Sequence, residues 1–126
     1  SLGSLSNLTT LKARFNEISY LSDSIEKLIN LTFLDVSFNK LTYLPDSIVN
    51  LSSLIELNVS ENDLSYLPDG IGNLSNLIEL YAYGNKLTGL PYSLRYLSNL
   101  TTLSTGNNNF SKIPDWLNQN KITVYI

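Results

Sequence analysis

The sequence of 126 residues contains no cysteine and no histidine. Without cysteine, the chain can form no disulfide and offers no thiolate as a nucleophile or metal ligand. Without histidine, it lacks the side chain that serves most often as a general base or metal ligand near neutral pH. It also has no glycine-rich phosphate loop. We therefore expect a protein that is not an enzyme and that holds no cofactor and no metal.

Long apolar runs and concentrated charge are also missing. No run approaches the ~20 apolar residues of a membrane span, and no signal peptide is visible. Charged residues make up 15% of the chain, with a net charge of −3 and a pI near 4.7. The eight lysines and arginines do not gather into a basic stripe, so we do not expect nucleic acid as a partner. Localisation stays open between a cytoplasmic protein and an exported bacterial one.

A pattern of the form L-x-x-L-x-L-x-x-N recurs along the chain at a constant interval of 23 residues. One copy runs from Leu31 to Asn39, with Leu34 and Val36 at its middle apolar positions. Constant repeats of this length are typical of solenoids, in which each unit packs only on its neighbours. The copies end at Asn16, Asn39, Asn62, Asn85 and Asn108.

The second half of each repeat is equally regular. Most copies have a Leu-Pro step followed by apolar residues three apart, which fits a short helix or 3₁₀ turn. An aspartate that follows the proline, or Ser22 in the first repeat, is predicted to cap this turn, because a carboxylate accepts from unpaired N–H groups at a helix start. These aspartates are Asp23, Asp46, Asp69 and Asp115.

These features resemble the leucine-rich repeat family in its 23-residue form, which ends in L-P-x-x-I. The variant is similar to intracellular Ras-associated members and to many bacterial ones. The resemblance implies an α/β fold: a curved right-handed solenoid with a parallel sheet on the concave face and short helical or 3₁₀ turns on the convex face. It covers residues 1–126 as a single domain of about five repeats.

Both ends depart from the repeat. Residues 1–8 align with the second half of a repeat, so we expect the chain to be a fragment of a longer repeat protein. Residues 118–126 break the period and then alternate, which predicts a capping edge strand. In this strand, Val124 and Ile126 should take the positions of Leu103 and Thr105.

The asparagine row is predicted to be structural rather than catalytic. The chain must turn sharply after each strand, which leaves backbone donors and acceptors unpaired inside the protein. An amide supplies both a donor and an acceptor, so a stacked ladder of amides can satisfy these groups. The predicted ladder is Asn16, Asn39, Asn62, Asn85 and Asn108.

The positions between the apolar residues of each strand should point onto the concave face, because strand side chains alternate with a period of two. These positions include Ser37 and Ser60 and vary in size and charge, as a recognition surface requires. The candidate partner-binding residues are Lys12, Arg14, Phe33, Asp35, Phe38, Glu56, Asn58, Glu61, Glu79, Tyr81 and Tyr83. Basic side chains at one end, carboxylates in the middle and exposed aromatics suit a protein partner with a basic or aromatic-anchored segment. The alternative is that they are ordinary strand formers on a solvated face.

Two functions fit these observations. The first is a protein–protein interaction module that binds its partner on the concave sheet. The second is a targeting or autoinhibitory repeat portion of a larger signalling enzyme or bacterial effector. Tyr20, Tyr43 and Tyr66 form a further row that either shields the turns or provides another contact patch. The N-x-S/T sequons, such as the one at Asn58, are interpreted as by-products of a template rich in Asn, Ser and Thr.

Overall fold

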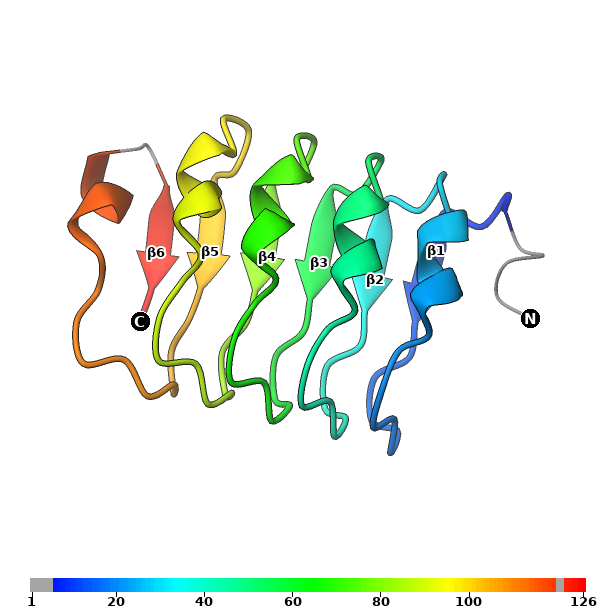
Figure 1. Ribbon diagram of the computed structural model, residues 1–126, viewed down its shortest axis with the longest axis horizontal. Helices are drawn as coiled ribbons and strands as arrows, with labels where there is room; N and C mark the ends of the chain where they lie inside the picture. Colours follow the sequence, from blue (N-terminus) through cyan, green and yellow to red (C-terminus); the bar gives the residue numbers. More distant parts are fainter. Residues whose placement is uncertain (1–5, 120–121) are drawn as a thin grey trace.

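The computed structural model describes residues 6–119 and 122–126, with no description of the side chains of residues 118 and 119. The described residues form one parallel sheet whose strands follow the order of the sequence. Figure 1 shows these strands in one layer and the helices in a second layer, coil after coil along the long axis. The strands are β1 (Thr10–Lys12), β2 (Phe33–Asp35), β3 (Glu56–Asn58), β4 (Glu79–Tyr81), β5 (Thr102–Ser104) and β6 (Thr123–Tyr125). The 3₁₀ helices are η2 (Asp23–Lys27), η3 (Asp46–Asn50), η4 (Asp69–Asn73), η5 (Tyr92–Tyr96) and η6 (Asp115–Gln119). The predicted solenoid is confirmed.

The repeat interval sets the register of the sheet. Leu34 of β2 lies opposite Leu11 of β1 and Leu57 of β3, and Leu80 and Leu103 continue the row. From β2 to β5 these central leucines are fully buried. Successive strand residues point to opposite faces, so the residues on either side of each leucine point away from the core.

Each helical turn begins where the sequence predicts, but the predicted aspartate caps are wrong. Pro45, Pro68 and Pro91 are the residues that precede η3, η4 and η5, and they make no side-chain cap hydrogen bond. In η2 the preceding residue is Ser22, whose hydroxyl accepts from the Ser24 N–H at 3.1 Å. The aspartates are instead the first residues of their helices, where a carboxylate acts only through the positive end of the turn. They are Asp23, Asp46, Asp69 and Asp115.

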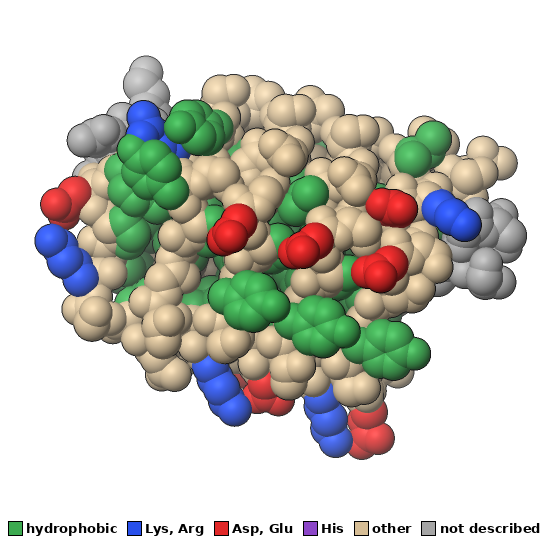
Figure 2. Space-filling view, viewed as in Figure 1, with side chains coloured by type: hydrophobic (Ala, Val, Ile, Leu, Met, Phe, Trp, Pro, Cys, Tyr) green, Lys and Arg blue, Asp and Glu red, His purple; other side chains and the backbone are tan. Residues whose placement is uncertain are grey.

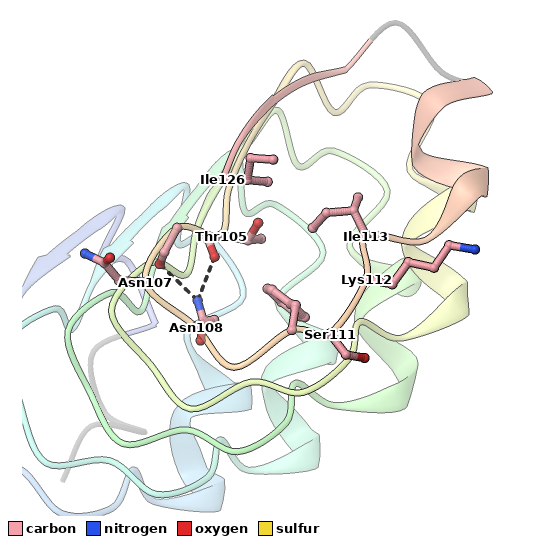
Figure 3. Close-up of a pocket in the computed structure, with 9 residues that line it drawn as sticks. Thr105, Asn107, Asn108, Ser111, Lys112, Ile113 and Ile126 are labelled. Carbon is pink, nitrogen blue, oxygen red and sulfur yellow. Dashed lines mark hydrogen bonds between the residues drawn. The ribbon is translucent and has the colours of Figure 1, made fainter.

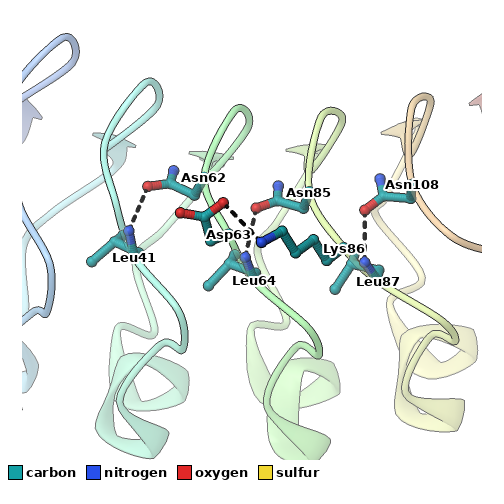
Figure 4. A network of polar contacts seen from close by, with 8 residues as sticks. All are labelled: Leu41, Asn62, Asp63, Leu64, Asn85, Lys86, Leu87 and Asn108. Atoms are coloured by element: carbon teal, nitrogen blue, oxygen red, sulfur yellow. Dashed lines mark hydrogen bonds and ion pairs between the residues drawn. The ribbon is translucent and has the colours of Figure 1, made fainter.

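The asparagine side chains link neighbouring coils behind the strand ends. The Asn62 amide nitrogen donates to the carbonyl oxygens of Val36 at 3.1 Å, Val59 at 3.0 Å and Ser60 at 3.1 Å. Its amide oxygen accepts from the Leu41 N–H at 3.0 Å. Figure 4 shows this link repeated from coil to coil. The equivalent bonds are made by Asn39, Asn85 and Asn108. Asn16 is exposed and, among the described residues, donates only to carbonyls of its own coil, those of Ala13 and Arg14.

A second row of amides, which the sequence analysis missed, links the coils ahead of the strands. The side chains of Asn30, Asn76 and Asn99 donate to backbone carbonyls 24 residues upstream at 2.8–3.0 Å. Asn30 and Asn99 belong to sequons that were interpreted as by-products of the template. The signal was present as an in-register row of Asn, broken only by Ser53 in the third coil.

The last described strand, β6, pairs in parallel with β5, with Val124 opposite Leu103 and Tyr125 opposite Ser104. Residues 120–121 of the predicted capping segment, and residues 1–5 of the predicted first half-repeat, lie outside the described residues. None of the helices in the described part of the chain is long and apolar enough to cross a membrane.

Candidate functional site on the concave sheet

The concave face carries three rows of side chains that run across the strands. The register places Phe33, Glu56 and Glu79 in the first row and Lys12, Asp35, Asn58 and Tyr81 in the second. The third row lies just beyond the strand ends and contains Arg14, Ser37, Ser60 and Tyr83. Neighbouring strands are ~4.8 Å apart, so a ligand that lies across them contacts successive members of a row.

In the middle of this face, the side chains stand out from the sheet less than the sequence predicted. Asp35 is only 5% exposed, and its Oδ1 accepts from the Ser37 N–H and from the Ser37 hydroxyl. Ser37 and Ser60 are fully buried, so the prediction that they point outward to solvent is wrong. A hydroxymethyl group is too short to emerge between the larger side chains around it. Asp35 therefore contributes negative charge to the face and little contact area.

The centre of the face concentrates negative charge. Glu56 and Glu79 lie opposite each other on β3 and β4. Burial raises the pKa of Glu56 to about 7, and a hydrogen bond to Glu79 and repulsion from Glu79 and Asp35 contribute to the shift. The Tyr81 hydroxyl donates to Glu79 Oε1 at 3.2 Å, and burial together with the Glu79 charge raises the pKa of Tyr81. A cationic group placed here relieves this repulsion.

The N-terminal end of the face is cationic and aromatic. The guanidinium of Arg14 lies 4.7 Å from the ring centre of Phe15 and 5.5 Å from that of Phe38. These two rings stack with their centres 4.4 Å apart, although Phe15 is 66% exposed. The Lys12 ammonium lies 5.6 Å from the ring centre of Phe33. Within the described residues, neither cation pairs with a carboxylate.

The residue before each ladder asparagine has a left-handed backbone. Phe15, Phe38 and Glu61 have φ values of 59°, 57° and 55°, whereas the fourth coil has Gly84 with φ 68°. This conformation costs a residue with a side chain about 1–2 kcal/mol. Phe38 and Glu61 were predicted on the face without this backbone, although Gly84 in the same position indicates it.

One exposed aromatic of the face was missed. Tyr125 on β6 continues the second row opposite Ser104 and is 58% exposed. The alternation of residues 122–126, together with the inward placement of Val124, was enough to predict it.

The opposite, helix-bearing side carries the tyrosine row. Tyr20, Tyr43 and Tyr66 are 64%, 43% and 52% exposed, while Leu44 and Leu67 beside them in sequence are buried. Figure 2 shows hydrophobic side chains in a row across this face, with acidic side chains gathered above them. Their exposure leaves this row open as a second contact patch.

Two cavities of the described part of the chain lie at the edges of the concave face rather than at its acidic centre. One of about 520 Å³ is at the C-terminal end, where Figure 3 shows Thr105, Ile113 and Ile126 around the open side of the last loop. Another, of about 490 Å³, lies near the strand starts beside Ile55 and Ile78. In residues 6–119 and 122–126, no group of three or more Asp or Glu side chains is arranged to hold a metal ion.

The comparisons with known proteins point to one family. A model described as a leucine-rich repeat region matches residues 1–109, and one described as a leucine rich repeat matches residues 99–120. An internalin (inlF) from Listeria monocytogenes has a similar structure, with a TM-score of 0.83 and 26% identity over 98% of this chain and 36% of that one. A leucine-rich repeat protein of Leptospira interrogans gives a TM-score of 0.78 and 27% identity over 99% of this chain and 38% of that one.

A third similar structure is that of the plant peptide hormone receptor RGFR1 in complex with RGF2. Its TM-score is 0.87, with 31% identity over 98% of this chain and 21% of that one. The chain thus spans well under half the length of each of these three proteins. A comparison with curated proteins gave no match. The repeat, the parallel solenoid and the two family models agree, and the chain belongs to the leucine-rich repeat family.

Proposed function

We propose that this chain is a protein–protein interaction module that binds a protein partner on its concave sheet. The observation that carries the proposal is the contrast between the inward and outward positions of the strands. The inward positions repeat one apolar template, whereas the outward positions differ in charge and size from coil to coil. A rigid scaffold with freely varied outward side chains is what specific recognition requires.

The chemistry of the face supports the same proposal. Exposed aromatic side chains and arginine are the types enriched at binding hot spots, and both occur around Arg14, Phe15 and Phe38. Phe15 and Phe38 keep a costly left-handed backbone, and the ring of Phe15 is exposed while that of Phe38 is partly exposed. Strained residues cluster at functional sites, where the strain is offset by what the side chain does.

The structural relatives are consistent with an interaction role. One of them, a peptide hormone receptor that is 31% identical to this chain, was solved in complex with RGF2. This complex supports a peptide or protein as the partner of this chain. No catalytic step is part of the proposal, because the carboxylates of the face lie on an open sheet rather than in a closed pocket. The same face also serves if this chain targets or inhibits a larger enzyme, in which case the partner is a domain of that enzyme.

The test is affinity capture with matched variants on the two sides of the solenoid. Glu79→Lys/Tyr81→Ala changes the concave face, and Asp46→Lys/Tyr43→Ala makes a comparable change on the helix-bearing side. Circular dichroism and melting temperature establish that both variants are folded. Partners captured by the wild type should be lost with the first variant and kept with the second. Equal capture by all three proteins refutes the concave site, and loss with only the second variant moves the site to the tyrosine row.

A further inference from the structure

We propose that the concave face recognises an extended peptide segment with one acidic and one basic side chain, four or six residues apart. The acidic side chain binds at Arg14, and the basic side chain binds between Glu56 and Glu79. This inference rests on the proposed function, since it names the chemistry of the partner for the same face. Three features of the face support it: the charges at its two ends, the low surface between them and the distance that separates them.

Arg14 is prepared for a carboxylate. Its guanidinium is held over the stacked rings of Phe15 and Phe38, and a guanidinium held by its flat face keeps its N–H edges available. Two of these N–H groups match a carboxylate in a bidentate arrangement. No acidic side chain of the described residues fills that position, and Lys12 nearby adds a second positive charge.

Glu56 and Glu79 are prepared for a cation. They are brought together across β3 and β4, and Asp35 on β2 adds further negative charge. A lysine or arginine of the partner that enters between them replaces this repulsion by attraction. Tyr81 lies beside the pair in the second row and provides an aromatic surface for the methylene groups of such a side chain.

The surface between the two ends lets a peptide backbone lie close to the sheet. Asp35 is nearly buried and Ser37 and Ser60 are fully buried, so no large side chain rises there. Asn58, which is partly exposed in the middle of the face, uses its amide oxygen to accept from the Ser60 N–H. Within the described residues, its amide N–H groups make no hydrogen bond and can bind a peptide carbonyl. The buried Ser60 hydroxyl also lacks a hydrogen-bond partner, which marks this region as polar and incompletely satisfied.

The separation of the two ends sets the spacing of the two charges. Arg14 follows β1, and the two glutamates begin β3 and β4, so the ends are two to three strands apart and four residues apart along the strand direction. With strands ~4.8 Å apart and ~3.3 Å per residue, the diagonal is roughly 16–20 Å. An extended chain covers at most about 3.3–3.6 Å per residue. Since alternate residues face the same way, only even spacings place both charges on the sheet. Six positions span about 20–22 Å and cover the diagonal, whereas four span about 13–14 Å and need the long charged side chains of the peptide to cover the remaining ~2–6 Å.

The test is a selection from a displayed library of random linear peptides, carried out in parallel on the folded wild type and on variants. Arg14→Glu reverses the charge at one end, and Glu56→Gln/Glu79→Gln neutralises the other. Tyr43→Ala on the helix-bearing side is the control. The wild-type and control pools should be enriched in an acid and a base four or six residues apart. The Arg14→Glu pool should gain a base in place of the acid, and the double glutamine pool should lose the base.

Synthetic peptides from the wild-type pool then give affinities by fluorescence anisotropy. Replacing either charge by alanine should weaken binding about 10-fold, the loss typical of one charge-assisted pair. A wild-type pool without the charge pair, pools unchanged by both variants, or no enriched peptide at all would overturn the inference. Peptides that lack the pair but lose binding to Glu79→Lys/Tyr81→Ala leave the proposed function intact. Peptides or partners that bind this variant as well as the wild type contradict both.

Discussion

Replacing Asn62 by leucine tests the energetic role of the amide ladder, because leucine has a similar size but cannot make hydrogen bonds. The substitution removes three donated bonds and one accepted bond. The carbonyls keep other partners: Val36 and Val59 still accept from the Asn39 and Asn85 amides. The Leu41 N–H keeps no partner, because its acceptor in the ladder is the Oδ1 atom that the substitution removes. The loss should therefore be concentrated on one buried N–H group.

The expected magnitude follows from this asymmetry. A buried donor without an acceptor costs about 1–3 kcal/mol, and each weakened carbonyl bond adds at most ~0.5–1.5 kcal/mol. Burial of the new leucine offsets part of the loss. We expect Asn62→Leu to lower the free energy of unfolding by about 2–4 kcal/mol.

The assay is guanidinium unfolding followed by the fluorescence of Trp116, the single tryptophan. Asn16→Leu is the matched control, because Asn16 is exposed and donates only within its own coil. It should lower the free energy of unfolding by less than ~1 kcal/mol, as surface substitutions usually do. An unchanged unfolding midpoint for Asn62→Leu, or an equal loss in both variants, refutes the reasoning.

Three further predictions concern the core, the turn and the acidic centre. Leu57→Ala, at a fully buried position, should lower the free energy of unfolding by about 2–5 kcal/mol in the same assay. Gly84→Ala should lower it by about 1–2 kcal/mol, because φ at Gly84 is +68° and a Cβ would come within 2.5 Å of Glu61 Cδ. Gly89→Ala, with open space around the site, should be neutral or slightly stabilising, and equal effects at the two glycines contradict the backbone argument. The pKa of Glu56 rises from 4.5 to about 7, so its folded carboxyl holds the proton and its contribution to stability is lost as the pH rises through this window. Glu56→Gln should therefore be more stable than the wild type above pH 7 and lose that advantage below pH 4.5, as measured by unfolding at several pH values; parallel pH profiles refute it.

The fold was predictable because the same apolar pattern recurs in every repeat at a constant interval. A single L-x-L segment is compatible with a strand or a buried helix, but the constant interval aligns Leu34, Leu57 and Leu80 in one row. The turn after each proline was predicted as a short helix for the same reason. The aspartate caps failed because another residue occupies the position before the helix, namely Ser22 in η2 and a proline in η3 and η4.

Which side chains lie on the outward side of the sheet was largely predictable, whereas how far each one stands out from the sheet was not. Alternation placed Glu56, Glu79 and Tyr81 on the outward side, where the register puts them. The alternation did not predict that Ser37 is buried or that one oxygen of Asp35 accepts hydrogen bonds from Ser37. Both depend on how neighbouring coils cover short side chains. The raised pKa of Glu56 likewise depends first on burial within the folded sheet, and then on the meeting of two carboxylates that are 23 residues apart in sequence.

The left-handed position before each asparagine shows where this chain departs from what its scaffold favours. The fourth coil has glycine there, which adopts φ 68° without steric cost, so the repeat tolerates the residue that the backbone prefers. The first two coils instead have Phe15 and Phe38, which adopt the same backbone at a cost of about 1–2 kcal/mol each. Their rings are not buried in the core; they stack on each other beneath the Arg14 guanidinium. A strained backbone and exposed aromatic area both raise the free energy of the unbound protein. A partner that covers the rings lowers the free energy of the complex and so offsets part of this cost. The N-terminal end of the concave face is therefore where binding should contribute most.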